Sequence, residues 1–259
     1  MTSDSWADEP PRAKLTPGDS FFEVIEEAYR VFAYPKPTTT GVCERCCMDA
    51  KIEADFFKPE IRDLPLHWVQ DWYSGAYDPD GIPKETWGYL LPRILEILAA
   101  GAGLNVTAFE VGLSCFDTGN PNSWSSDEWA VLDRFQRMYL RRHIAPTQEM
   151  LDDVICLFGL AGWSLESLLE QAASSSDAEL AQRLWHDWCE WTAPGMESVW
   201  ITPFWDGVGG KAVVDFYTSR EMYDRMVALA FGADTDPELA AKALAVAGVI
   251  EKSVPSGGS

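Results

Sequence analysis

The sequence predicts an all-α protein, an irregular multi-helix domain of stacked helical pairs. Apolar residues recur at spacings of three and four along most of the chain, which is the pattern of amphipathic helices. Helix-capping residues repeatedly precede these segments, and short loops rich in Gly, Pro, Asn or Asp separate them. The helix lengths suit a solenoid-like stack, but no residue pattern repeats at a fixed period, so an irregular domain is favoured.

In the first half of the chain, capping and breaking residues set the expected helix ends. Ser20 and Glu23 have the spacing of a capping box, and Pro35 ends the helix that they open. Pro92 lies inside a later helical pattern and predicts either a kink or two abutting helices there, while Gly101 ends the pattern. The expected helices are therefore one that opens at Ser20 and others over 48–57, 65–77, 84–100 and 106–115.

The second half continues this pattern with one exception. Capping boxes open helices at Ser125–Glu128, Ser176–Glu179 and Thr218–Glu221. The expected helices run over 125–143, 147–158, 164–173, 176–188, 218–232 and 236–251. In the segment 196–217, Gly207, Gly209 and Gly210 separate two short apolar runs. This segment is therefore expected to be a small hairpin or an irregular insert.

The chain is expected to form a single helical domain over residues 19–252. Residues 1–18 are predicted to be a disordered acidic tail, because they are polar and contain the Pro10–Pro11 pair, and residues 253–259 a second disordered tail. The N-terminal stretch does not resemble a signal peptide, and no apolar run approaches the length of a membrane span. Six cysteines without an export signal indicate reduced thiols, so a cytoplasmic location is expected.

Charge limits the kinds of partner that the protein can bind. Twenty Lys and Arg stand against forty-one Asp and Glu, which gives a formal net charge of −21. A surface this negative repels phosphate groups, so nucleic acids and anionic membranes are excluded as partners. It attracts a basic protein and speeds the encounter at low salt, so a basic protein partner is expected. The alternative is that the acidity only keeps the protein soluble.

The chain is tryptophan-rich and rich in other aromatic residues, with 12 Trp, 12 Phe and 8 Tyr. Each ring buries on the order of 150–250 Å² when it is enclosed, so most rings are expected in the core. Some could instead serve as anchors on a binding surface.

The thiols between Cys43 and Cys47 are the strongest candidates for a metal site. Cys43 and Cys46 have ligand spacing, and Cys47 could replace either. Structural zinc takes four ligands, and His186 with Cys189, three apart on an expected helix, would complete a Cys₃His set. Two alternatives stay open: the cysteines are buried small apolar residues, or the Cys43–Cys46 pair is redox-active, although no strand–helix pattern surrounds it. No other cofactor is expected.

No catalytic residue is predicted. The sequence lacks a Gly-x-Ser-x-Gly elbow, a His-Glu-x-x-His motif and a Glu-x-x-His pair. His143 follows two arginines at a helix end, where positive charge complements the helix dipole, and His67 beside a tryptophan suits a half-buried, hydrogen-bonded ring. Glu96 and Glu110 lie among apolar residues, and either pairing with Arg93 or simple exposure to solvent explains them. The chain is therefore expected not to be an enzyme.

Three short motifs carry a resemblance to known proteins. They are Tyr34-Pro35-Lys36-Pro37, Cys43-x-x-Cys46 and Leu91-Pro92-Arg93-Ile94-Leu95-Glu96. Over about the first half of the chain, they resemble a group of bacterial helical proteins to which no activity is assigned. The resemblance implies a bacterial, cytoplasmic, mostly helical protein. Acidity, size and aromatic content are also similar to those of toxin-neutralising immunity proteins, which is an analogy of composition alone.

These observations favour a non-catalytic protein-interaction function. In the leading hypothesis, the acidic helical surface docks a basic protein, such as a toxin or an enzyme that it neutralises. The first alternative is a zinc-stabilised structural or binding module that uses Cys43 and Cys46. The second alternative is a hydrolase or transferase whose residues are too scattered to recognise. The sequence sets neither the oligomeric state nor the identity of the partner.

Overall fold

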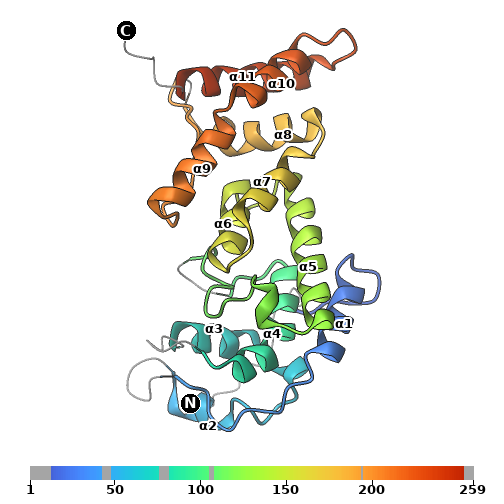
Figure 1. Cartoon of the computed structure of the whole chain (residues 1–259), viewed down its shortest axis with the longest axis vertical. Helices are drawn as coiled ribbons and strands as arrows, with labels where there is room; N and C mark the ends of the chain where they lie inside the picture. The colour runs from blue at the N-terminus through green and yellow to red at the C-terminus, as the bar shows by residue number, and fades with distance from the viewer. Residues whose placement is uncertain (1–12, 43–47, 76–81, 105–107, 194, 254–259) are drawn as a thin grey trace, which may run out of the picture. The chain divides into compact units, whose positions relative to one another are not determined.

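The structure, a computed structural model, describes residues 13–42, 48–75, 82–104, 108–193 and 195–253 (Figure 1). Throughout these ranges the regular secondary structure is helical, and none of the described residues forms a strand. The predicted all-α fold class is therefore confirmed. None of the helices in the described ranges combines the length and the apolar composition needed to cross a bilayer.

The chain divides into two compact units, a first unit of Met1–Met138 and a second unit of Tyr139–Ser259. The division falls within helix α5 (Ser126–Ile144). Compactness alone does not make a unit fold independently, so the single domain expected over 19–252 stays a prediction. Most of both predicted tails lies outside the described residues, which begin at Ala13 and end at Ser253.

Helix α4 (Lys84–Ala99) is the centre of the first unit. It is buried along its whole length from Trp87 onward and continues through Pro92. The other helical elements of this unit are α1 (Phe22–Val31), α2 (Ala50–Asp55), η2 (Ile61–Asp63), α3 (Leu66–Gly75), η3 (Pro121–Ser123) and most of α5. Because α4 is apolar around its circumference, it needs neighbours on all sides, and both α1 and η2 pack against it.

Aromatic rings fill the core beside α4. Trp72 and Trp87 stack with their ring centroids 6.2 Å apart, and Tyr73 meets the Trp87 ring edge-on. The Trp87 indole N–H donates a hydrogen bond to Thr118 Oγ1 at 3.0 Å, so the polar atom of this buried ring has a partner. All three rings are buried, which confirms for them the core position expected of most aromatic residues.

The helix expected over 106–115 is wrong for its described part. Residues 110–119 form consecutive turns, and side chains hold their carbonyl groups. Thr118 Oγ1 donates to the Leu113 carbonyl at 2.8 Å, and the Trp124 indole N–H donates to the Thr118 carbonyl at 2.8 Å. Side-chain donors thus take the place of the amide donors that a helix would provide.

The pairing of Arg93 with Glu96 expected from the sequence is confirmed. The Arg93 side chain is fully buried and donates to the Glu96 carboxylate at 2.9 Å and to the Ala13 carbonyl. Glu96 also accepts from the Tyr29 hydroxyl at 2.7 Å and from the Leu15 amide at 3.2 Å. The beginning of the described chain is therefore packed into the first unit, although the predicted tail extends to residue 18.

The second unit contains the end of α5 and all the later helices. These are α6 (Leu151–Leu160), α7 (Leu165–Ala173), α8 (Asp177–Trp188), α9 (Gly207–Tyr217), α10 (Arg220–Ala230) and α11 (Pro237–Ser253). Helices α8, α10 and α11 pack on one another, and α6 packs against α7 and α8 (Figure 1). Helix α7 also contacts α9, and that pair of helices forms the walls of the candidate site.

Local sequence signals account for several of the helix starts. Both reciprocal bonds of a capping box are present at Ser125–Glu128 and at Ser176–Glu179, as predicted. Two other starts differ from the prediction: Ser219 rather than Thr218 caps α10, and Phe21 rather than Ser20 occupies the cap position of α1.

Helix α6 begins at Leu151 rather than at Thr147 for a tertiary reason. The carbonyls of Ala145 and Glu149 accept hydrogen bonds from the Arg183 guanidinium, at 3.1 and 2.8 Å. These bonds from a side chain more than thirty residues away hold the residues from 145 to 149 as a loop.

The segment 196–217 is irregular as far as Asp206 and helical thereafter, so the hairpin alternative is wrong. Asp206 caps α9 by accepting from the Gly209 amide at 2.5 Å. The Trp205 ring packs so closely that an added Cβ would lie 3.0 Å from it at Gly209, and 2.7 Å from it at Gly159 of α6. These glycines therefore let an indole pack between two helices.

We expect the variant Gly159→Ala to destabilise the second unit by about 1–3 kcal/mol, because the added methyl group would overlap the Trp205 ring. The matched control is Gly248→Ala in α11, where an added Cβ meets no atom within 4 Å. This control should stabilise the protein by about 0.5–1 kcal/mol, since alanine replaces glycine inside a helix. Urea denaturation followed by circular dichroism measures both changes. Increased stability of Gly159→Ala would contradict the packing described here.

Candidate functional site

The predicted zinc site stays a prediction. Three of its candidate ligands, Cys43, Cys46 and Cys47, lie outside the described residues. Among the residues that are described, no group of three or more His, Cys, Asp or Glu side chains could hold a metal ion. The other two candidates, His186 and Cys189, belong to the second unit, whereas the thiol run belongs to the first.

His186 and Cys189 both have other surroundings in the second unit. The His186 Nδ1 faces the Glu190 carboxylate, and its Nε2 lies 3.1 Å from the Thr147 carbonyl oxygen. Both partners are hydrogen-bond acceptors, so each ring nitrogen faces a protein oxygen rather than an open coordination position in this conformation. Burial, assisted by the charge of Glu197, raises the pKa of the Cys189 thiol to about 11. This shift disfavours the thiolate that zinc binding and redox chemistry need.

His143 is a buried structural residue. Its ring stacks on Tyr139 with the centroids 4.2 Å apart, and its Nδ1 lies 2.8 Å from the Tyr139 carbonyl oxygen. On the other side, Nε2 lies 3.7 Å from the Glu149 carboxylate, and hydrogen bonding from His143 holds the pKa of Glu149 below its usual value. These contacts join the end of α5 to the loop before α6, rather than placing the imidazole in a cavity.

Two hollows of the first unit are poorly suited to a ligand. One, of about 880 Å³, is lined by charged residues that already pair with one another, as Arg62 does with Glu26 and Arg134 with Glu27. The other, of about 720 Å³, reaches Val42, next to residues that the structure does not describe. Neither hollow is therefore taken as a candidate binding site.

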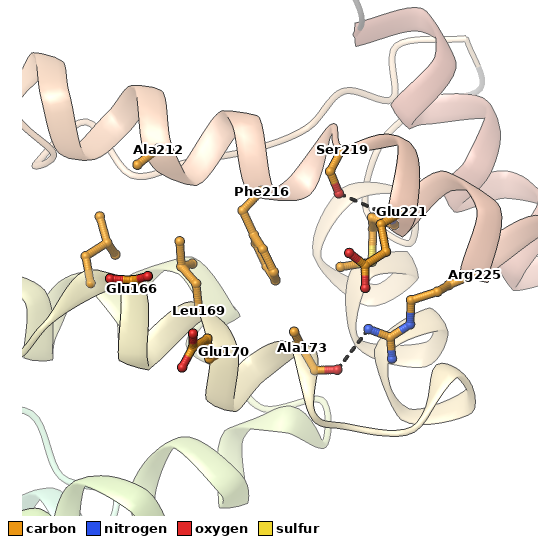
Figure 2. Close-up of a pocket in the computed structure, with 11 residues that line it drawn as sticks. Glu166, Leu169, Glu170, Ala173, Ala212, Phe216, Ser219, Glu221 and Arg225 are labelled. Atoms are coloured by element: carbon orange, nitrogen blue, oxygen red, sulfur yellow. Dashed lines mark hydrogen bonds between the residues drawn. The ribbon is translucent and has the colours of Figure 1, made fainter.

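The candidate site is a groove of about 460 Å³ lined by α7, α9 and α10 in the second unit (Figure 2). Leu165, Leu169 and Ala173 follow one another at intervals of four along α7, and Ala212 and Phe216 do the same on α9. Residues four apart lie on one side of a helix, so each set forms a continuous apolar stripe. Figure 2 shows the Phe216 side chain pointing from α9 towards α7, where Leu169 points towards α9.

Three carboxylates surround this apolar lining. Glu166 and Glu170 are four residues apart on α7, Glu221 lies in the first turn of α10, and all three are exposed. Within the described chain, none of them has an ion pair or a side-chain hydrogen bond. One reason is plain in the sequence: no Lys or Arg occurs between Arg142 and Arg183. We call Glu166, Glu170 and Glu221 the acidic rim.

Arg225 closes one end of the groove without neutralising the acidic rim. One terminal nitrogen donates to the Ala173 carbonyl at 2.8 Å (Figure 2). The other donates to the Ser175 carbonyl at 2.7 Å, and the Nε donates to Asp177 at 2.6 Å. These charge-assisted bonds hold the link between α7 and α8 against α10. The guanidinium therefore shapes the end wall, and its charge is balanced by Asp177.

The lining of the groove is suited to binding rather than to covalent chemistry. The described residues that line it include no histidine, cysteine or lysine. Its one hydroxyl group, Ser219 Oγ, accepts the Met222 amide at 3.1 Å as the cap of α10. A nucleophile needs an adjacent base that activates it, and none of the described lining residues provides that pair.

Sequence reasoning missed this groove. The sequence shows the spacing of Leu165 and Leu169 on a predicted helix. The opposite wall was expected to be a hairpin or an irregular insert, so Ala212 and Phe216 were not expected to share one side of a helix. One signal was available: Asp206 precedes a run that contains two apolar residues four apart, which is the pattern of a capped helix.

Comparison with known proteins reveals no relative. No family model matches the sequence, and no curated protein or solved structure shows significant similarity to it.

Proposed function

We propose that this chain is a non-catalytic protein-interaction protein that binds a basic protein partner through the groove between α7, α9 and α10. One observation carries the proposal: an apolar groove is surrounded by three exposed carboxylates that have no partner within the described chain. The net charge of −21 adds a long-range attraction for the same class of partner.

The two parts of the groove contribute differently to binding. Burying the apolar stripes supplies a favourable transfer free energy of about 25 cal/mol for each Å² removed from water, and the surplus over the cost of association appears as affinity. The acidic rim contributes less affinity, but it speeds the encounter with a basic surface and disfavours acidic competitors. A basic toxin or a basic enzyme that is held inactive by the complex is the kind of partner that suits both parts.

The experiment is site-specific photo-crosslinking in lysates of cells that produce the protein, where the salt concentration can be set. A benzophenone amino acid replaces Ala212, inside the groove, or Ala245, an exposed position of α11, in the full chain. We expect position 212, and not position 245, to crosslink one protein of basic composition, with a yield that falls as the salt concentration rises. Equal crosslinking at both positions, an acidic captured protein, or no crosslink at low salt would contradict the proposal.

A matched pair of charge variants tests the acidic rim. The double variant Glu166→Gln/Glu170→Gln removes two charges at the groove, and Asp234→Asn/Glu251→Gln removes two exposed charges elsewhere in the second unit. Each variant removes two negative charges from the protein, so the long-range attraction for a basic partner weakens by the same amount in both. We expect only the groove variant to reduce the salt-sensitive crosslink at position 212, because the local rim charges act at short range.

A further inference from the structure

The geometry points to a more specific ligand: we infer that the groove receives one face of a basic amphipathic α-helix of the partner. This inference rests on the proposed function and goes further, because it states the conformation of the bound segment. It also predicts how the apolar and basic residues of that segment are spaced.

The walls of the groove have the form that a third helix would fill. Helix α7 has nine residues and α9 has eleven, so at 1.5 Å per residue they offer about 13–16 Å of wall, or roughly three turns of a bound helix. In Figure 2 the two helices run alongside each other with their apolar stripes facing the space between them. A helix laid along the groove that they line would insert anchors at positions i, i+3 or i+4, and i+7.

The apolar stripe of α9 extends beyond the groove. Val208 precedes Ala212 by four residues, so it continues the line formed by Ala212 and Phe216, and its side chain is 81% exposed. A small pocket for a single side chain would not need this extension. A partner helix longer than the groove would cover it.

The acidic rim sets the charge of the bound helix. Glu166 and Glu170 lie four apart on α7, each next to a residue of its apolar stripe. A partner helix with lysine or arginine beside its apolar anchors, also at intervals of three or four, would meet both carboxylates at once. Glu221 offers a third contact at the end closed by α10.

The composition of the chain argues against an occupant of its own. The stretch 1–12 carries Asp4, Asp8 and Glu9 against Arg12, and the stretch 254–259 has no charged side chain. A second copy of the protein would bring another −21 of charge to an acidic rim. Charge complementarity therefore favours a basic helix that belongs to a different protein.

The test uses the full chain and a fluorescein-labelled peptide of about 18 residues, since shorter helices are marginal in water. The peptide places leucine at i, i+3 or i+4, and i+7, with lysine beside these positions. Two control peptides keep the same charge: one replaces the leucines by serine, and the other carries a central proline that breaks the helix. Fluorescence anisotropy at low salt measures binding.

We expect the helical peptide to bind at least about tenfold more tightly than either control peptide. The serine peptide lacks the apolar face, and the proline peptide lacks the continuous helix. The variant Ala212→Trp fills the groove without changing the charge and should weaken binding by about tenfold or more. Ala245→Trp adds the same side chain at an exposed site of α11 and should leave binding unchanged. Circular dichroism checks that both variants are folded. The variant Glu166→Gln/Glu170→Gln tests the same site without filling it, and it should also weaken binding of the helical peptide.

The outcomes separate this inference from the proposed function. Equal binding of the proline-containing peptide, or no binding of the helical one, overturns the helical ligand, while crosslinking at position 212 to a basic protein would still support the proposed function. Undiminished binding to both Ala212→Trp and Glu166→Gln/Glu170→Gln shows that bulk charge holds the peptide and overturns the inference. A groove that binds all three peptides equally, and loses all three in Ala212→Trp, would indicate a basic extended segment instead.

Discussion

The variant Trp87→Ala is expected to lower the free energy of unfolding of the first unit by about 3–5 kcal/mol. The Trp87 ring is completely buried, stacks on Trp72 and meets Tyr73 edge-on, so its removal leaves a cavity that the neighbouring rings cannot fill without leaving their own contacts. The change also removes the hydrogen bond from the indole N–H to Thr118 Oγ1. Urea denaturation followed by circular dichroism measures the loss.

The control for this prediction is the same substitution at an exposed ring. Trp191 is 81% exposed, so Trp191→Ala should change the free energy of unfolding by no more than about 0.5 kcal/mol. Trp87→Phe should fall between the two variants, because the phenyl ring fills part of the cavity. Equal stability losses in Trp87→Ala and Trp191→Ala would show that Trp87 is not a core residue.

Arg183→Met should destabilise the second unit by about 3–5 kcal/mol, because it leaves a buried carboxylate without its cation. The side chains of Arg183 and Asp187 are 0% and 3% exposed, and the Arg183 Nε donates to Asp187 at 2.9 Å. The same guanidinium holds the carbonyls of Ala145 and Glu149. The substitution therefore also releases the loop that connects α5 to α6.

Two further variants identify the cause of this loss. The double variant Arg183→Met/Asp187→Leu removes both charges and should recover part of the stability, since an apolar pair can replace a buried ion pair. Arg141→Met breaks the ion pair with Glu179, whose partners are 60% and 40% exposed, and should cost less than about 1 kcal/mol. Equal destabilisation by Arg141→Met and Arg183→Met would show that the burial of the Arg183–Asp187 pair does not cause the loss of stability.

Parts of the structure could be predicted because they depend on residues close together in the sequence. The capping boxes at Ser125 and Ser176 each join residues three positions apart, and so does the Arg93–Glu96 pair. Local interactions of this kind do not need the rest of the fold. The start of α6 shows the limit of such reasoning, because Arg183, more than thirty residues away, displaces it.

The helical class, the strong negative charge and most helix starts follow from composition, from the 3.6-residue period and from caps within a few residues, so they could be predicted without the structure. The direction in which the apolar stripe of α9 faces, towards α7, depends instead on tertiary contacts. The physical reason is distance along the chain: Trp205 is held by Asp152, and Arg225 holds the carbonyls of Ala173 and Ser175. These contacts join segments about fifty residues apart, and no local pattern reports them.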